Sequence, residues 1–212
     1  MRNKKLITTV IAVIIVALFG GAGYYFTETN GLETGKNLQT DGTIVVNYFD
    51  VGQGDSEFIQ LPDGKCMLID ASTSDCAERI IDFISRLGYS KIDYLVATHP
   101  HADHIGSMKA VVEHFDIGEI YMPRSSANTK TYENLLLAIA DKGLRINTAK
   151  AGVTVIQNDA LSAEFLAPVK ASYDNLNNYS AVLRLQYGNN VFLFMGDAED
   201  TAEMDILKTS EK

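Results

Sequence analysis

Three of the four histidines of the chain lie in one short segment, THPHADHIGS at residues 98–107. His99, His101 and His104 share this segment with Asp103. The apolar run IDYLVAT before it predicts a buried strand. Alternate side chains of an extended chain face the same way, so His99 and His101 should project together. Imidazole nitrogens and carboxylate oxygens suit zinc, and also manganese or iron. The segment therefore predicts a metal site at the carboxyl end of a buried strand.

Other residues that could bind a metal are weaker candidates. His114 lies within VVEHF on an expected helix, where a partly exposed structural histidine is the better interpretation. Cys66 and Cys76 are the only cysteines, and their spacing does not suit a zinc knuckle. Outside the membrane they could form a disulfide, and two partly buried free thiols are an equal alternative.

Around the histidines, the chain changes from hairpins to alternating strands and helices, and then back to strands. Its 212 residues, 46% of them hydrophobic, suffice for one sizeable domain with a core. Apolar runs and turn residues predict two packed sheets with helices outside. The expected strands are residues 43–49, 56–61, 66–70, 92–98, 117–123, 153–157, 163–168, 180–188 and 191–197. The expected helices are residues 75–87, 107–115, 131–143 and 198–212.

The first residues differ in composition from the rest. Residues 6–26 carry no charged side chain and match the roughly 20 apolar residues that cross a bilayer. The basic stretch MRNKK stays in the cytoplasm by the positive-inside rule, so the chain after it is exported. We expect a signal anchor or signal peptide at 1–26, a linker at 27–42 and a domain at 43–212. The expected location is the cell membrane, single-pass with an extracytoplasmic domain, or outside the cell after secretion.

The charge of the chain limits how it can bind nucleic acid. Asp and Glu number 27 against 18 Lys and Arg, for a formal net charge of -9. This balance argues against a surface that holds DNA by bulk positive charge. Metal ions that contact phosphate locally remain compatible with it.

Several motifs together resemble a known family. THPHADHIGS resembles the H-x-H-x-D-H motif of metallo-β-lactamase-fold hydrolases. DVGQGDS at 50–56, LIDAS at 68–72 and the stretch 177–199 occur with it in order. This set is similar to the hydrolase domain of ComEC-type competence DNA-uptake proteins and their stand-alone relatives, over nearly everything from Thr43 onward. The resemblance implies an α+β fold, a four-layer αββα sandwich with one or two metals at one edge.

The resemblance also implies roles for the residues of the site. His99 and His101 would bind a first metal, and Asp103 and His104 a second, with Asp197 as the bridging carboxylate. The metals would be zinc or manganese. Asp103 and Asp197 are the expected catalytic residues, with Asp103 holding the attacking water and taking its proton.

Five further residues are expected around the metals. Asp70 would orient a ligating histidine, and a turn or helix-capping aspartate is an equal alternative. Asp55 and Ser56 lie in a glycine-rich turn that the fold places beside the metals. The wider superfamily has another histidine before the Asp197 strand, where this chain reads NNYS, so Asn178 or Ser180 would line the site instead.

Members of the family continue past the last helix into a strand that ends in a His-His-Gly-Ser motif. The sequence ends at Lys212, before such a strand. We therefore expect the last strands of the sandwich, and one histidine of the second metal, to be missing.

The function that the resemblance implies is phosphodiester hydrolysis, of DNA or a nucleotide, by a metal-activated hydroxide outside the cytoplasmic membrane. It would be related to competence DNA uptake. The expected partners are the substrate and, through residues 6–26, the membrane, and no obligate protein partner is evident. Two alternatives stay open: hydrolysis of another ester, a lactam or a thioester, and an inactive metal-binding fragment.

Overall fold

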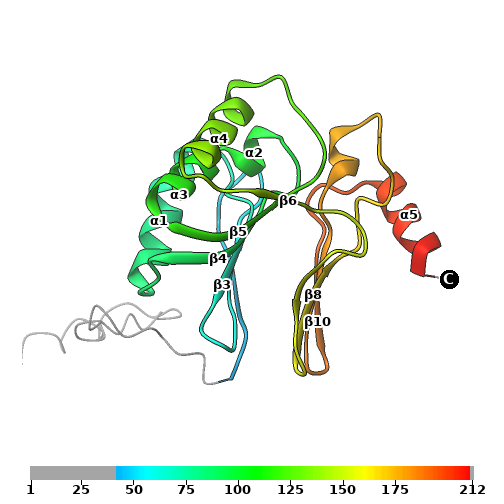
Figure 1. Cartoon of the computed structure of the whole chain (residues 1–212), viewed down its shortest axis with the longest axis horizontal. Helices are drawn as coiled ribbons and strands as arrows, with labels where there is room; N and C mark the ends of the chain where they lie inside the picture. Colours follow the sequence, from blue (N-terminus) through cyan, green and yellow to red (C-terminus); the bar gives the residue numbers. More distant parts are fainter. Residues whose placement is uncertain (1–41, 211–212) are drawn as a thin grey trace, which may run out of the picture. The chain divides into compact units, whose positions relative to one another are not determined.

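The computed structural model describes residues 42–210, which belong to one compact unit spanning residues 34–212. The expected signal segment 1–26 lies outside the described residues, as does the linker apart from its last residue. Within residues 42–210, no helix is long and apolar enough to cross a membrane. The described part contains two β-sheets, with helices packed on the first (Figure 1).

The first sheet has six strands in the order β1-β2-β3-β4-β5-β6. They are β1 (Val45–Tyr48), β2 (Glu57–Gln60), β3 (Cys66–Ile69), β4 (Lys91–Val96), β5 (Asp116–Met122) and β6 (Ile146–Thr148). The first three pair antiparallel, as the hairpins in the sequence predict, and β3 to β6 run parallel. The carboxyl ends of the four parallel strands therefore meet at one edge, and the histidine segment begins there.

Helices cover one face of this sheet. They are α1 (Ala77–Arg86), α3 (Met108–His114) and α4 (Lys130–Asp141), each leading into the next parallel strand. Their apolar stripes supply buried side chains such as Ile80, Ile84 and Leu135 to a core shared with Phe58 and Leu95 of the sheet. This is the helix-on-sheet packing that the apolar spacing predicts.

The second sheet packs on the opposite face of the first. Its four strands, in the order β10-β9-β8-β7, are β7 (Thr154–Gln157), β8 (Leu161–Phe165), β9 (Leu183–Tyr187) and β10 (Asn190–Phe194). All neighbours are antiparallel. Phe165 and Leu183 join Met67 and Val96 of the first sheet in one buried cluster, which makes the two sheets a sandwich.

The α+β sandwich predicted from the sequence is confirmed, but residues 42–210 form three of its four expected layers. The last helix, α5 (Asp200–Ser210), contacts the 3₁₀ turn η2 (Leu176–Tyr179) at the end of the second sheet (Figure 1). Val191 and Leu193 of β10 face away from the core and stay 52% and 51% exposed. Within the described residues, no helix layer shields these two side chains.

Cys66 and Cys76 are both buried and both free. Cys66 donates a hydrogen bond to the carbonyl of Lys91 at 3.2 Å, and burial raises the pKa of its thiol to about 12. Of the two alternatives, the structure shows the pair of buried thiols.

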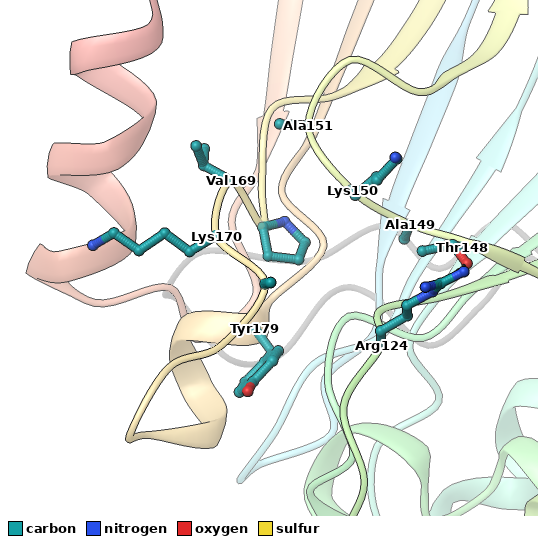
Figure 2. A pocket seen from close by; sticks show the side chains of 10 residues that line it. Arg124, Thr148, Ala149, Lys150, Ala151, Val169, Lys170 and Tyr179 are labelled. Atoms are coloured by element: carbon teal, nitrogen blue, oxygen red, sulfur yellow. Dashed lines mark hydrogen bonds between the residues drawn. The ribbon is translucent and has the colours of Figure 1, made fainter.

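A cavity of about 450 Å³ opens between loops of the two sheets (Figure 2). Three of these loops follow β5, β6 and β8, and η2 supplies a fourth wall. Because β5 and β6 run parallel to β4, the cavity lies at the same edge as the histidine segment.

Candidate metal centre

The histidine segment begins where β4 ends and continues into the short helix α2 (Ala102–Ile105). His99 is buried, and its Nε2 lies 3.0 Å from Nδ1 of His101. The two side chains project together, as expected for alternate positions on an extended chain. Nearby, the rings of His99 and His104 lie with their centres 4.1 Å apart.

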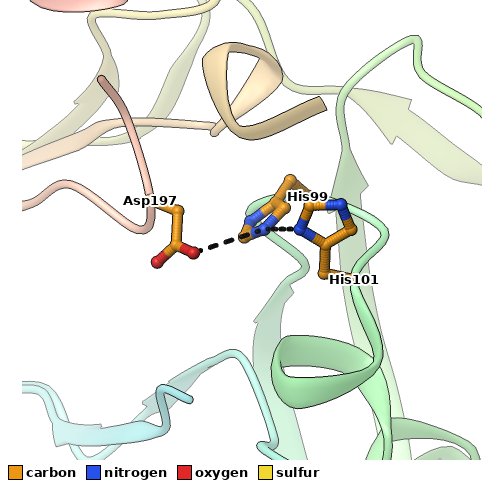
Figure 3. Close-up of side chains that lie close together, drawn as sticks. All are labelled: His99, His101 and Asp197. Carbon is orange, nitrogen blue, oxygen red and sulfur yellow. Dashed lines mark hydrogen bonds and ion pairs between the residues drawn. The ribbon is translucent and has the colours of Figure 1, made fainter. Parts of the chain in front are cut away.

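Asp197 reaches this cluster from the second sheet, just after β10. Gly196 before it has a φ of +51°, and a Cβ there would lie 2.9 Å from the Thr98 side chain. This close approach brings the carboxylate of Asp197 to 3.9 Å from Nε2 of His99 (Figure 3). The same carboxylate lies 3.3 Å from Nε2 of His104. The site is therefore built from both sheets.

The donor set of His99, His101 and Asp197 fits a metal ion. One ligand atom from each residue lies within 4.8 Å of the others. Two ring nitrogens and a carboxylate oxygen are ligands that zinc and other divalent metals accept, at about 2.0–2.2 Å for zinc. Atoms that each lie about 2 Å from one centre must lie within about 4 Å of one another, which these three approach without a large rearrangement.

Asp70 holds His104 in one orientation. Both side chains are fully buried, and Nδ1 of His104 lies 2.7 Å from Oδ2 of Asp70. The Nδ1 hydrogen is therefore donated to Asp70, and Nε2 is left to face Asp197. Burial alone would lower the pKa of His104, but the carboxylates of Asp70, Asp197 and Asp103 outweigh it and raise the pKa to about 9. A metal bound at Nε2 of His104 would therefore displace a proton. This is the contact that the first of the two alternatives for Asp70 requires. That His104 is a metal ligand stays a prediction.

A second chain of hydrogen bonds fixes His99. The Thr98 hydroxyl donates to Oδ2 of Asp70 at 2.6 Å and lies 3.1 Å from Nδ1 of His99. Since that hydroxyl hydrogen is used, its oxygen can accept from Nδ1 of His99, which leaves the lone pair on Nε2, where it faces His101. Burial, and then the neighbouring His104 and His101, lowers the pKa of His99 to about 3. A neutral imidazole is the form that binds metals.

Asp103 lies outside the compact donor set. Its Oδ2 accepts a hydrogen bond from Nε2 of Gln53 at 3.0 Å. Burial raises the pKa of Asp103, but that hydrogen bond and the nearby His104 and His101 outweigh it, so the pKa is held below its usual value. Asp103 is therefore ionised at neutral pH. The structure places it beside the three residues of the donor set, in contact with the 50–56 turn.

Two residues of that turn form hydrogen bonds with the backbone of Asp103 and Asp70. The backbone N–H of Asp55 donates to the carbonyl of Asp103 at 3.3 Å, and the hydroxyl of Ser56 donates to the carbonyl of Asp70 at 3.2 Å. Glu57, on β2, is buried beside them. Burial, and then Asp55 and Asp70, raises the pKa of Glu57 to about 9, so its carboxyl is neutral at pH 7.

Two residues of the NNYS segment, Asn178 and Ser180, make contacts with different parts of the structure. The hydroxyl of Ser180 lies 3.5 Å from Nδ1 of His99, so it borders the cluster. Asn178 faces away, accepting hydrogen bonds from the backbone N–H groups of Glu199 and Ala202 at the start of α5. Its role is to hold the chain just after Asp197. His114 is exposed at the end of α3, with its ring packed on Phe115, so it stands apart from the site.

Three contributors were not expected from the sequence: Thr98, Gln53 and Glu57. Thr98 precedes the first ligand and carried a signal, because a hydroxyl next to a ligating histidine is a natural hydrogen-bond partner. Gln53 meets the site through a hydrogen bond to Asp103, 50 positions away, and Glu57 lies close to Asp70 and His104, 13 and 47 positions away. Neither residue type marks such a contact in the sequence.

Comparison with known proteins agrees with this fold. The family model of the metallo-beta-lactamase superfamily matches residues 49–209. The chain is similar to ComE operon protein 3 of Bacillus subtilis (strain 168), with 27% identity over 179 residues. That match covers 76% of this chain, but the chain spans only 23% of the length of the relative.

Two solved structures share the fold at low identity. CmlA, a diiron β-hydroxylase from Streptomyces venezuelae, matches with a TM-score of 0.50 and 16% identity, over 77% of this chain and 32% of its own. A metallo-β-lactamase motif mutant from Cronobacter sakazakii gives 0.50 and 14%, over 77% and 69%. Since the family model spans most of the sequence, and includes the histidine segment and Asp197, the chain belongs to the metallo-beta-lactamase superfamily.

Proposed function

We propose that this metallo-hydrolase is a phosphodiesterase that cleaves DNA or nucleotides. The observation that carries the proposal is the convergence of His99, His101 and Asp197 within 4.8 Å, with His104 beside them. The similarity to ComE operon protein 3, together with the competence-type segments of the sequence, supports a phosphodiester as the substrate.

The residues of the chain divide the work. His99, His101 and Asp197 would hold a zinc or manganese ion, and His104 and Asp103 would hold a second. A bound ion supplies Lewis acidity and lowers the pKa of a coordinated water. Asp103, ionised and fixed by Gln53, orients the attacking water and accepts its proton. Asp70 and Thr98 keep the imidazoles in the tautomers that present Nε2.

The proposed setting is outside the cytoplasmic membrane. Residues 6–26 would anchor the chain as a signal anchor, or direct it to secretion, with 27–42 as the linker to the domain. A hydrolase on the outer side could act on DNA before or during uptake.

The test compares two histidine substitutions in the full-length chain, loaded with zinc or with manganese. The substrates are a fluorescent single-stranded oligonucleotide and bis(p-nitrophenyl) phosphate. We expect metal-dependent cleavage of both, lost by about 1,000-fold or more in His101→Ala and unchanged in His114→Ala, since only His101 contributes a ligand. An intact oligonucleotide and an intact ester after incubation with metal would contradict the proposal.

Two further measurements distinguish the alternative functions. Turnover of nitrocefin without phosphodiester cleavage would show a lactam hydrolase instead. Elemental analysis of the purified chain addresses the inactive fragment, which would carry less than about one metal ion in ten molecules, whereas the proposed enzyme binds close to one or more.

A further inference from the structure

The cavity at the edge of the sandwich is lined by basic side chains. Arg124 follows β5, Lys150 follows β6, and Lys170 lies in the loop after β8. Figure 2 shows the Lys170 side chain directed toward α5, away from the cavity, which agrees with its 2.8 Å ion pair with Asp205. Arg124 and Lys150 are therefore the cations that the cavity can offer to a ligand.

These two side chains differ from most other basic residues of the described part of the chain. Seven basic residues there pair with a carboxylate: Lys65, Arg86, Lys91, Lys109, Lys130, Lys170 and Arg184. Within residues 42–210, no carboxylate pairs with Arg124 or Lys150. Nε of Arg124 instead donates to the Thr148 hydroxyl at 3.4 Å, which steadies the guanidinium and leaves its other donors free.

Backbone hydrogen bonds connect the cavity directly to the metal centre. The N–H of Ala97, two residues before His99, donates to Tyr121 on β5, and the N–H of Ala149 donates to Met122, both at 2.9 Å. Across the sandwich, the N–H of Ala181 donates to Thr98 at 2.9 Å, and Tyr179 just before it lines the cavity. Neighbouring strands lie about 4.8 Å apart, so the ends of β4 and β6 are separated by about 10 Å.

We propose that this cavity binds a second phosphate of the substrate, beside the phosphodiester held at the metal centre. The inference rests on the proposed phosphodiesterase function and narrows it to substrates with more than one phosphate, such as a nucleic acid strand. Guanidinium and ammonium groups are the usual protein partners of phosphate. Phosphates recur about every 3.4 Å of axis along one strand of a duplex, so a few nucleotides span the distance from the metal centre to the cavity.

The position of Arg124 and Lys150 also explains how an acidic protein can bind a polyanion. A net charge of -9 repels a polyanion, and Asp103 and Asp197 add negative charge at the site itself. Two unpaired cations next to that site provide local attraction that the overall charge does not.

The test compares a double substitution, Arg124→Ala with Lys150→Ala, against Arg145→Ala in the metal-loaded full-length protein. Arg145 is exposed and immediately precedes β6, so it lies at the opposite edge of the sheet.

For a single-stranded oligonucleotide, we expect the double variant to raise KM by about 10-fold or more, because 1.4 kcal/mol of lost contact is tenfold. For bis(p-nitrophenyl) phosphate, which has one phosphate, kcat/KM should stay within about twofold. Arg145→Ala should change neither. An equal loss with both substrates, or no loss with the oligonucleotide, overturns the inference.

A binding measurement separates this inference from the proposed function. Anisotropy of the labelled oligonucleotide, read in the His101→Ala background, needs no turnover. Loss of the contact with this one phosphate should reduce the slope of log K against log salt by about 0.7, the value for one phosphate on a single strand. If the wild type cleaves neither substrate, the proposed function fails, yet a reduced slope still supports the cavity. An unchanged slope, or no binding by the parent, refutes the cavity whatever the activity.

Discussion

At the scale of single residues, the centre depends on a buried carboxylate that is not itself in the donor set. Asp70 has a φ of 52°, a conformation that residues other than glycine rarely adopt. It accepts hydrogen bonds from the Thr98 N–H, the Thr98 hydroxyl and His104. Backbone strain of this kind persists where surrounding contacts fix the position, and it gathers at functional sites. We therefore expect Asp70 to act as a positioning residue.

Asp70→Asn tests that role. An amide can keep the turn and one bond to Thr98, but it no longer offers His104 an ionised acceptor for its Nδ1 hydrogen. We expect the affinity for zinc to fall by about 10- to 100-fold, with folding retained. Competition with a fluorescent chelator measures it, and Asp63→Asn, in a turn at the far edge of the sheet, serves as the control. Equal affinity in both variants would leave Asp70 as a turn residue only.

Glu57 gives the domain a pH dependence. Its pKa rises from 4.5 to about 9 on folding, through burial and then through Asp55 and Asp70. The folded protein keeps this proton while the unfolded chain releases it. The contribution to the free energy of unfolding is therefore full below pH 4.5 and is lost as the pH rises toward 9.

Glu57→Gln should remove most of that loss. Glutamine keeps the shape of the side chain but cannot ionise. Between about pH 5 and about pH 8, the free energy of unfolding should therefore decrease less in the variant than in the wild type. The difference between the two decreases should be about 1 kcal/mol or more, since each unit of pKa is worth about 1.4 kcal/mol. Urea unfolding in EDTA measures it without metal. Glu113→Gln, an exposed helix position, should follow the wild type. A variant that declines as steeply as the wild type would show that Glu57 ionises freely in the folded state.

At the scale of elements, the turn at residues 50–56 must approach the start of α2 closely. Gly54 has a φ of +102°, and a Cβ there would lie 1.9 Å from the carbonyl oxygen of Asp103. Gly64, in the β2–β3 turn, has a φ of +82° with open space around it. Alanine at Gly64 therefore tests backbone strain alone, whereas alanine at Gly54 tests backbone strain together with close packing.

Gly64→Ala should cost only the left-handed conformation, about 1–2 kcal/mol. Gly54→Ala adds a steric overlap with backbone that must move, so we expect a loss larger by about 2 kcal/mol and weaker metal binding, because Asp103 and the Gln53 contact shift with it. Urea unfolding and chelator competition give both values. The idea of a required close approach fails if the two alanine variants lose the same stability and both keep metal affinity.

The elements that the sequence predicted well are those with strong apolar patterns. The buried strand before His99 and the stripe of Ile80 and Ile84 are found as β4 and α1. β6 was missed because it has three residues with no buried side chain, so no periodicity marks it. Helices outside both sheets were expected from the apolar pattern and from the family resemblance, and residues 42–210 place α5 beside η2 instead.

The sequence predicted the part of the site that depends on local spacing or on the family resemblance. Local spacing placed His99 and His101 side by side, and the resemblance pointed to Asp197 across 96 positions. The pocket cations Arg124 and Lys150 could not be found in this way, because each is an ordinary exposed residue in sequence. Only the parallel order of β4, β5 and β6 brings them to the same edge as the histidines.

At the scale of the whole domain, the metal centre joins the two sheets. The histidines extend from the first sheet through β4 and α2, whereas Asp197 and Ser180 come from segments next to β10 and β9 of the second. A metal held by ligands from both sheets binds the folded domain and not the unfolded chain. Binding should therefore stabilise the sandwich as one unit.

Thermal and urea unfolding with and without metal test this coupling. At a free zinc concentration of about 100 times Kd, the free energy of unfolding should rise by about 2.7 kcal/mol. Asp197→Asn removes the carboxylate that reaches across from the second sheet, so the increase should shrink to below about 1 kcal/mol at the same zinc concentration. Asp200→Asn, an exposed position three residues on, makes the same charge change outside the donor set and should keep the full increase. If Asp197→Asn gains as much stability from zinc as the wild type, the histidines of the first sheet bind the metal alone, and the second sheet is not part of the centre.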